Sequence, residues 1–468
     1  MAIKQVPPLD LAWLMLESRD TPMHVGGLFE FTLPDDAPPD YLKQQVERMR
    51  ASTQTVHPPW NLRLVEGPLI GPRLPLMREE RDIDLSYHVR HSALPHPGGQ
   101  RDLGILVSRL HGHQLDLHRP LWEAHVIEGL EGNRFALYTK MHHSLIDGVS
   151  GMRMMLRTLS TDPAERGMPM FWSVEAGKRP RREGDDGGPV GRVAGAARSG
   201  AKAVVGLSRA AIDLGRAAVD SRSLTAPYRA PRGSALSGQL AGQRRFATQQ
   251  YELDRIKALA RAADCTLNDI VLYLSGTALR RYLSEHGELP DRPLSAGILV
   301  NLRDADDEST GTAIGMMVAE LGTNVANPRE RLEAIRRSTA DAKDHLKKLP
   351  DDARTYYTLL INGPYIAGLV AGFGNRSPLP FNVAISNVPG PPEPLYFNGA
   401  RLDAFFPLSL LLHGGALNIT CVSYAGTLNF GFTGARDSLP HLQRLAIYMG
   451  EALDELEGVL APGARAPA

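Results

Sequence analysis

Apolar and polar positions alternate most clearly between residues 134 and 141, where apolar side chains recur at every second position. This two-residue period predicts a strand. Between residues 149 and 159 the apolar positions recur at roughly helical spacing, which predicts a helix. The short segment 142–148 therefore joins the end of a strand to the start of a helix, at the rim of a sheet where a substrate has access.

The same patterns predict further strands and helices in alternation, so the fold class is α/β. Strands are predicted at 25–32, 87–91, 124–127, 245–253, 295–300, 316–325, 381–386, 417–424 and 428–433. Helices are predicted at 10–16, 41–49, 103–113, 254–263, 266–279, 328–347 and 440–456, and at 354–373 with a break at Gly363-Pro364. The strands at 124–127 and 134–141 are separated by a Gly-containing turn, which favours a hairpin.

Composition limits the classes of partner and cofactor. The chain has 468 residues, enough for two domains, and its 52 basic and 52 acidic residues cancel, so bulk charge indicates no nucleic-acid partner. Cys265 and Cys421 are the only cysteines, which favours a reducing compartment without a disulfide framework. The sequence has neither a cysteine/histidine cluster nor a glycine-rich nucleotide loop, so we predict no metal and no bound cofactor.

Apolar segments in the sequence are short. The apolar run 11–16 is followed by charged residues and does not resemble a secretory signal. The run 365–373 is well below the ~20 residues that a spanning helix needs. We expect a cytoplasmic protein that is neither secreted nor transmembrane.

A basic segment divides the chain. Residues 178–232 contain twelve Lys or Arg and five Asp or Glu, a net charge of +7, among many Gly, Ala and Pro. If 190–219 is helical, four basic residues share one face: Arg198, Lys202, Arg209 and Arg216. Such a face suits anionic lipid headgroups at a membrane or lipid inclusion, but a crossover helix with a solvated basic face is an equal alternative.

The joining segment carries the candidate chemistry, because it reads His142-His143-x-x-x-Asp147-Gly148. A neutral imidazole accepts a proton from a hydroxyl near pH 7, since its ordinary pKa is about 6.5. Two adjacent histidines cannot both point to one place, so we expect His143 or His142 to be catalytic and the other to support it. A packed histidine pair beside a turn is the alternative for the pair alone.

The histidine motif resembles that of the acyltransferase superfamily that includes chloramphenicol acetyltransferase, carnitine acyltransferases and peptide-synthetase condensation domains. Five further segments make the sequence similar to the bacterial wax ester synthase/acyl-CoA:diacylglycerol acyltransferase family, over about residues 8 to 456 and more weakly between 174 and 242. They are Pro22–Gly26, Pro120–Glu123, Asn268-Asp269, Asn301–Arg303 and Ser386–Pro391.

The resemblance implies two chloramphenicol acetyltransferase-like domains, each a mixed sheet flanked by helices, with a channel between them. We expect an N-terminal domain at 1–173, a linker with a crossover helix at 174–243 and a C-terminal domain at 244–468. The implied reaction moves a long-chain acyl group from acyl-CoA to a fatty alcohol or diacylglycerol, in storage-lipid and triacylglycerol synthesis. Acyl-CoA is a substrate, and the oligomeric state is not indicated.

The resemblance also implies residue roles. His143 is the general base, His142 supports the loop, and no covalent acyl-enzyme forms. Asn268 is the candidate oxyanion donor or alcohol-positioning residue, with a helix start as an equal alternative. Asp147 and Gly148 support the turn, and Asp147 is expected to form a buried ion pair with Arg303.

Four residues are weaker candidates for the substrate and coenzyme A channel. His24 precedes a strand within a Gly-containing run, and a plain strand-entrance histidine is as good an interpretation. Asn387, Pro389 and Gly390 lie in a turn whose backbone would lie beside coenzyme A or would serve structure alone. Two other functions stay open: acyl transfer from a carrier-protein thioester, and lipid binding without turnover.

Overall fold

The computed structural model describes residues 3–6, 8–65, 75–174, 225, 227–301, 314–348 and 351–461. Its contacts separate two compact units, each assembled from distant parts of the chain. The first unit draws on Met1–Ala176, Leu240–Ile256 and Asn387–Ala446, and the second on Gly177–Gln239, Lys257–Ser386 and Ile447–Ala468. The sequence-based domain limits at 173 and 244 stay a prediction.

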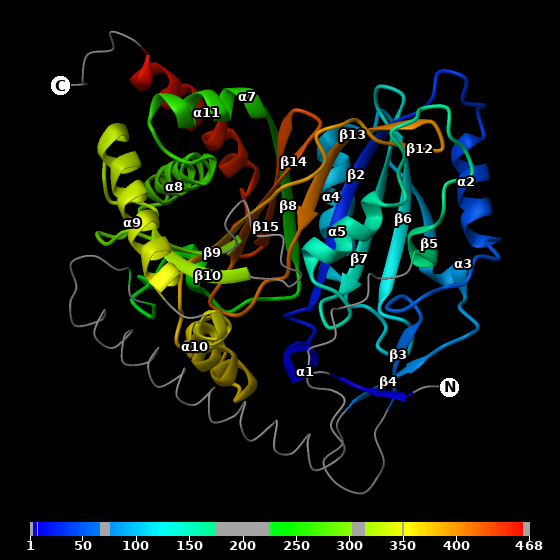
Figure 1. Ribbon diagram of the computed structural model, residues 1–468, viewed down its shortest axis with the longest axis horizontal. Helices are drawn as coiled ribbons and strands as arrows, with labels where there is room; N and C mark the ends of the chain where they lie inside the picture. Colours follow the sequence, from blue (N-terminus) through cyan, green and yellow to red (C-terminus); the bar gives the residue numbers. More distant parts are fainter. Residues whose placement is uncertain are drawn as a thin grey trace, which may run out of the picture. The chain divides into compact units, whose positions relative to one another are not determined.

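The first unit is built on a mixed sheet with the strand order β12-β13-β2-β7-β6-β5 (Figure 1). Its strands are β2 (His24–Thr32), β5 (Val89–Ala93), β6 (Trp122–Leu130), β7 (Arg134–His142), β12 (Tyr396–Phe397) and β13 (Ala400–Leu408). Neighbours are antiparallel, except that β5 and β6 are parallel. The predicted hairpin is confirmed as β6–β7, and its turn places Gly132 and Asn133 at positive φ.

The remaining elements of the first unit surround this sheet. Helices are α1 (Pro8–Leu16), α2 (Tyr41–Arg50), α3 (Leu85–His88), α4 (Gln100–Gly112) and α5 (Gly148–Leu156), with a 3-10 turn η1 (Phe171–Ser173). A small sheet has the order β1-β4-β3, from Ile3–Gln5, Leu76–Glu79 and Leu62–Val65. Strands β8 (Arg244–Glu252), β14 (Leu417–Tyr424) and β15 (Thr427–Ala435) are antiparallel, with β15 in the middle.

The two faces of the six-stranded sheet bury different cores. One face packs Val25, Phe29, Leu137 and Met141 with the methionines of α5, around the tryptophans Trp60, Trp122 and Trp172. The other face packs Leu28, Ile127 and Tyr138 beneath Leu103 and Val107 of α4. Because side chains alternate along a strand, neighbouring residues of β7 enter different cores.

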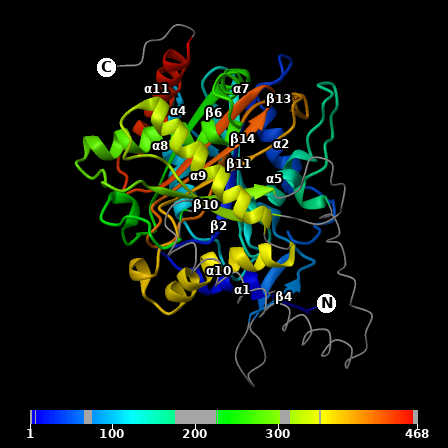
Figure 2. The ribbon, with the colours of Figure 1, turned by 60° about the vertical axis from the view of Figure 1, so that its left-hand side comes forward.

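The second unit contains a smaller set of strands covered by helices. β9 (Ser295–Asn301) pairs antiparallel with β10 (Ile314–Glu320) and parallel with β11 (Val383–Val388). The helices are α7 (Leu253–Ala262), α8 (Leu267–Glu285), α9 (Pro328–Lys348), α10 (Asp351–Val370) and α11 (Gln443–Leu460), with 3-10 turns η2 (Ala235–Ser237) and η3 (Gly374–Arg376). α9 packs on β10 and α8 (Figure 2). The predicted α/β class, with sheets flanked by helices, is confirmed.

The predicted break at Gly363-Pro364 is wrong, because α10 continues through Pro364. A proline inside a helix removes the N–H that would bond to the carbonyl four residues earlier, here Leu360. The hydroxyl of Tyr228 donates to this carbonyl at 3.1 Å and also bonds to the carbonyl of Ile361. A side chain from elsewhere in the second unit therefore supplies the missing donor.

Two other differences arise from local geometry. The strand predicted at 87–91 begins only at Val89, because Asp84 caps a helical turn by accepting from the backbone N–H of Tyr87 at 3.1 Å. β13 was not predicted, because a β-bulge between Leu402 and Ala404 disrupts its alternation.

None of the helices in the described ranges is long and apolar enough to span a membrane. The predicted basic helix 190–219 and residue Arg303 lie outside the described residues.

Candidate functional site

The histidine pair lies where the sequence predicted it, at the junction of a strand and a helix. β7 ends at His142, and α5 begins at Gly148. His142 is paired with His24 of β2, and the backbone N–H of His143 continues the ladder by donating to the carbonyl of Met23 at 2.8 Å. Strand alternation therefore directs His142 to the α4 face and His143 to the α5 face.

His142 is a fully buried histidine with defined hydrogen-bond roles. Its Nδ1 accepts from the backbone N–H of Ser144 at 3.1 Å and lies 2.7 Å from the Ser144 hydroxyl. Because Nδ1 is an acceptor, the neutral ring carries its proton on Nε2. Nε2 lies 3.4 Å from Oε2 of Glu17, whose side chain is only 3% exposed. His142 therefore faces the protein interior.

His143 has a different environment at the rim of the sheet. Its ring lies 4.4 Å from the ring of Trp13 of α1, centroid to centroid, at an angle of 42°. Burial lowers its pKa to about 4, against the raising effect of the Asp147 carboxylate and of a hydrogen bond to its own backbone. The imidazole is therefore unprotonated at neutral pH, the state that a general base needs.

Asp147 is the N-cap of α5. Its carboxylate accepts from the backbone N–H and from the hydroxyl of Ser150, both at 2.8 Å. The predicted ion pair with Arg303 lies outside the described residues and stays a prediction. A Cβ on Gly148 would meet no described atom within 4 Å, so available space does not require glycine there.

Asn268 belongs to the second unit, at the N-terminus of α8. The helix starts with a capping box in which Thr266 accepts from the backbone N–H of Asp269, and Asp269 accepts from that of Thr266. Nδ2 of Asn268 is buried and has no hydrogen-bond partner among the described residues. The adjacent helix start therefore does not use the Asn268 side chain as its cap.

The weaker channel candidates are held by protein contacts. The buried His24 places Nε2 2.8 Å from the carbonyl of His111, and burial lowers its pKa well below the ordinary value. Oδ1 of Asn387 accepts from Sγ of Cys421 at 3.4 Å. A Cβ on Gly390 would lie 2.3 Å from the carbonyl oxygen of Ser423, so close approach requires glycine. Channel roles for these residues and for Pro389 stay predictions.

Sequence reasoning did not predict a buried ionic group on the α4 side of the sheet. Glu123 bonds to Arg90 at 3.0 Å, to Lys140 at 3.3 Å and to His125 at 3.2 Å. Burial alone would raise the pKa of Glu123, but the His125 hydrogen bond and the charges of Lys140 and Arg90 lower it to about 2. Nζ of Lys140 also donates to the carbonyls of Leu110 and His113, which fixes the end of α4 to β7.

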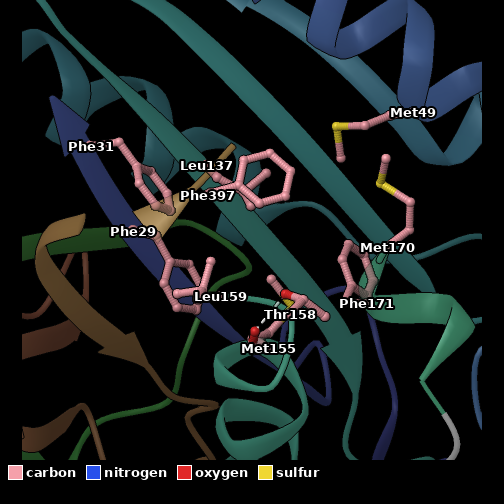
Figure 3. Close-up of a pocket in the computed structure, with 10 residues that line it drawn as sticks. All are labelled: Phe29, Phe31, Met49, Leu137, Met155, Thr158, Leu159, Met170, Phe171 and Phe397. Carbon is pink, nitrogen blue, oxygen red and sulfur yellow. Dashed lines mark hydrogen bonds between the residues drawn. The ribbon is translucent and has the colours of Figure 1, made fainter. Parts of the chain in front are cut away.

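An apolar cavity of about 20 Å³ lies in the core on the α5 side of the sheet (Figure 3). Its lining is Phe29, Phe31, Met49, Leu137, Met155, Thr158, Leu159, Met170, Phe171 and Phe397. The hydroxyl of Thr158 is satisfied by the carbonyl of Met155 at 2.6 Å. Leu137 precedes His143 by six residues, roughly 20 Å along a strand. A cavity this small holds about one water, so we interpret it as a packing gap.

Sequence reasoning missed Trp13 and Glu17, which bring α1 to the histidine pair. Neither residue belongs to a recognisable motif, and Glu17 opens a polar run, Glu17–Asp20, typical of an exposed loop. Their role becomes visible only through contacts with residues about 125 positions later in the chain. No grouping of His, Cys, Asp and Glu suited to a metal ion occurs among the described residues.

Comparisons with known proteins identify the family of the chain. The family model of the wax ester synthase/diacylglycerol acyltransferase catalytic domain matches residues 6–271, and that of the WS/DGAT C-terminal domain matches residues 310–457. A Mycobacterium tuberculosis relative that carries a diacylglycerol O-acyltransferase name is 45% identical, over 97% of both chains. The O-acyltransferase WSD of Acinetobacter baylyi is 38% identical, over 98% of both chains.

Solved structures give the same result. The wax ester synthase/diacylglycerol acyltransferase from Marinobacter aquaeolei VT8 has a TM-score of 0.79 and 37% identity, covering 98% of this chain and 100% of that chain. The first condensation domain of the calcium-dependent antibiotic synthetase has a TM-score of 0.57 at 15% identity, over 99% of this chain and 98% of that chain, and shares the fold. The chain is therefore an acyltransferase that belongs to the wax ester synthase/diacylglycerol acyltransferase family.

Proposed function

We propose that the protein transfers a long-chain acyl group from acyl-CoA to the hydroxyl of a fatty alcohol or a diacylglycerol, with His143 as general base. The observation that carries the proposal is the position of the His143 imidazole, directly after the end of β7 and 4.4 Å from the ring of Trp13. The names of the relatives, which include diacylglycerol O-acyltransferase and wax ester synthase, support the two acceptor classes. The products are a wax ester and a triacylglycerol.

The reaction proceeds in one enzyme-bound sequence. His143 takes the hydroxyl proton while the acceptor oxygen attacks the thioester carbonyl, and a tetrahedral oxyanion forms. The carbon–sulfur bond then breaks, and the imidazolium returns its proton to the coenzyme A thiolate. The acceptor oxygen is itself the nucleophile, so no covalent acyl-enzyme is needed. General base catalysis contributes about 10²–10⁴-fold, although a lowered pKa also makes the free imidazole a weaker base.

Asn268 is the proposed donor to the oxyanion or to the acceptor hydroxyl. A buried amide N–H₂ without a partner among the described residues is available to bind an oxygen of the substrate. One such donor is worth about 10²–10³-fold in kcat. The reaction as written consumes no cofactor, because acyl-CoA enters as a substrate.

The proposal is tested by incubating the pure protein with palmitoyl-CoA and hexadecanol, and separately with a diacylglycerol. Free thiol and ester are both measured. Release of free thiol and formation of ester in equal amounts support direct transfer from acyl-CoA. Ester formation only from a loaded acyl carrier protein would replace the donor in the proposal. Lipid binding without ester from any donor would contradict it.

We also propose peripheral association with a membrane or a lipid inclusion on the cytoplasmic side, because both acceptors are poorly soluble in water. The proposed contact uses Arg198, Lys202, Arg209 and Arg216. Each basic residue near an anionic surface is worth about 1 kcal/mol. Replacement of all four by Gln should abolish sedimentation with anionic liposomes and leave turnover of a short soluble alcohol intact. Unchanged sedimentation would remove this contact from the proposal.

A further inference from the structure

Glu17 is a buried carboxylate among exposed neighbours. Its side chain is 3% exposed, whereas Ser18, Arg19 and Asp20 are exposed. Oε2 accepts from the backbone N–H of Met23 at 2.5 Å and lies 3.4 Å from Nε2 of His142, and Oε1 accepts from Nε2 of Gln114 at 2.8 Å. Burying a carboxylate destabilises the folded protein unless the group is paired, so these contacts offset the cost of burying Glu17.

We propose that Glu17 is the positioning residue of the histidine pair, an inference that rests on the proposed role of His143. The first connection runs through the ring of His142. Nδ1 of that ring accepts from the backbone N–H of Ser144, which leaves the proton on Nε2, facing the Glu17 carboxylate. Ser144 therefore sets the tautomer, and Glu17 places its carboxylate charge 3.4 Å from Nε2, which favours this one orientation of the His142 ring.

The second connection runs through the main chain of Met23. Glu17 accepts from the N–H of Met23, and the carbonyl of Met23 accepts from the N–H of His143 at 2.8 Å. The Glu17 carboxylate is therefore two hydrogen bonds from the backbone of the proposed base. Nothing in this route requires Glu17 to contact a substrate.

Trp13 strengthens the assignment, because it lies four residues before Glu17, about one helical turn. Its ring contacts the ring of His143 at 4.4 Å. The end of α1 therefore holds both histidines, one by an aromatic contact and the other by a carboxylate. Since a misplacement of about 1 Å at a reacting group costs ~10²-fold in rate, loss of Glu17 should appear in kcat.

Glu17→Gln is the test variant, and Glu30→Gln is its matched control. Glu30 is an equally buried carboxylate on β2 of the same sheet, bonded to Gln100 and Arg134 and not to the histidine pair. Glu17→Gln should lower kcat about 10- to 100-fold with little change in the KM for acyl-CoA. Glu30→Gln should lower the melting temperature and leave kcat close to that of the native protein.

Two further measurements separate positioning from a general loss of structure. The double variant with His142→Ala should be less than additive in kcat, because both changes act on one connection. Long-range ¹H–¹⁵N spectra should show the Nε2–H tautomer of His142 in both proteins, with a shifted Nε2 resonance in Glu17→Gln because the facing charge is removed. The Nε2 resonance is measured without turnover, so it tests Glu17 even if the proposed reaction fails.

Equal losses of kcat in Glu17→Gln and Glu30→Gln would overturn the proposal. Full additivity with His142→Ala, or an unchanged Nε2 resonance of His142 in Glu17→Gln, would also overturn it.

Discussion

The loss of activity at acidic pH tests the protonation state of His143, the proposed base. Burial lowers the pKa of His143 from 6.5 to about 4, and the neutral ring is the active form. As the pH falls, activity should therefore persist through 6.5 and be lost only near 4. At pH 5.5, an ordinary histidine is about one-tenth neutral, whereas His143 should be more than about nine-tenths neutral. The expected difference in kcat/KM at this pH is about tenfold.

Protein stability has to be followed in the same experiment. Burial lowers the pKa of six histidines: His24, His88, His111, His125, His143 and His413. Between these lowered values and 6.5, the unfolded chain binds more protons than the folded protein. The free energy of unfolding therefore falls as the pH falls, by up to about 1.4 kcal/mol per pH unit for each such histidine.

The assay is the pH dependence of kcat/KM with a short soluble alcohol, measured by chromatography of the ester. Initial rates are taken from brief incubations, and tryptophan fluorescence reports folding at each pH. A loss of activity with a midpoint near 6.5, in protein that remains folded, would refute the reasoning. If the midpoint coincides with unfolding, the measurement is repeated with shorter incubations or added ligand before the loss of activity is attributed to protonation of His143.

Substitutions at Asp147, Trp122 and Tyr228 test the local structure by thermal or denaturant unfolding. Asp147→Ala should cost about 1 kcal/mol through loss of the α5 cap, whereas Asp147→Asn retains a capping side chain. A comparable loss in Asp147→Asn would instead favour the predicted ion pair with Arg303, and a less-than-additive double variant with Arg303→Ala would support it. Trp122→Ala should cost about 3–5 kcal/mol, because the buried ring packs on Trp60 and Trp172 and its Nε1 donates to the Trp60 carbonyl at 2.8 Å; a loss below about 1 kcal/mol would contradict this packing. Tyr228→Phe should cost about 1 kcal/mol and speed amide exchange around Pro364, and unchanged exchange would mean that the hydroxyl does not stabilise α10.

The sequence was most informative where local pattern and tertiary structure agree. The alternation before His142 and the helical spacing after Gly148 both concern neighbouring residues, so β7, α5 and their junction were predictable. The opposite orientations of His142 and His143 followed from the same two-residue period. The resemblance added the family and the fold architecture in outline, which periodicity alone does not supply.

Long-range contacts account for what the sequence did not reveal. Pro364 is a helix breaker by local rules, and the hydroxyl of Tyr228, more than 130 residues earlier, supplies the donor that proline cannot give to the Leu360 carbonyl. Lys140 has the polarity of an exposed strand position, yet it is buried because Glu123 and two carbonyls satisfy its charge. Glu17 was hidden for the same reason, since its partners are Met23 just before β2, His142 of β7 and Gln114 after α4.

The most direct test of the central claim is the acyl transfer activity of His143→Ala. Native protein, His143→Ala and His142→Ala are compared with palmitoyl-CoA and hexadecanol, and circular dichroism establishes that each variant is folded. His143→Ala should lose about 10²-fold or more of the native kcat, and His142→Ala should lose less, because it removes a positioning group. Folded His143→Ala that retains more than roughly a tenth of the native kcat would contradict the assignment of His143 as the base.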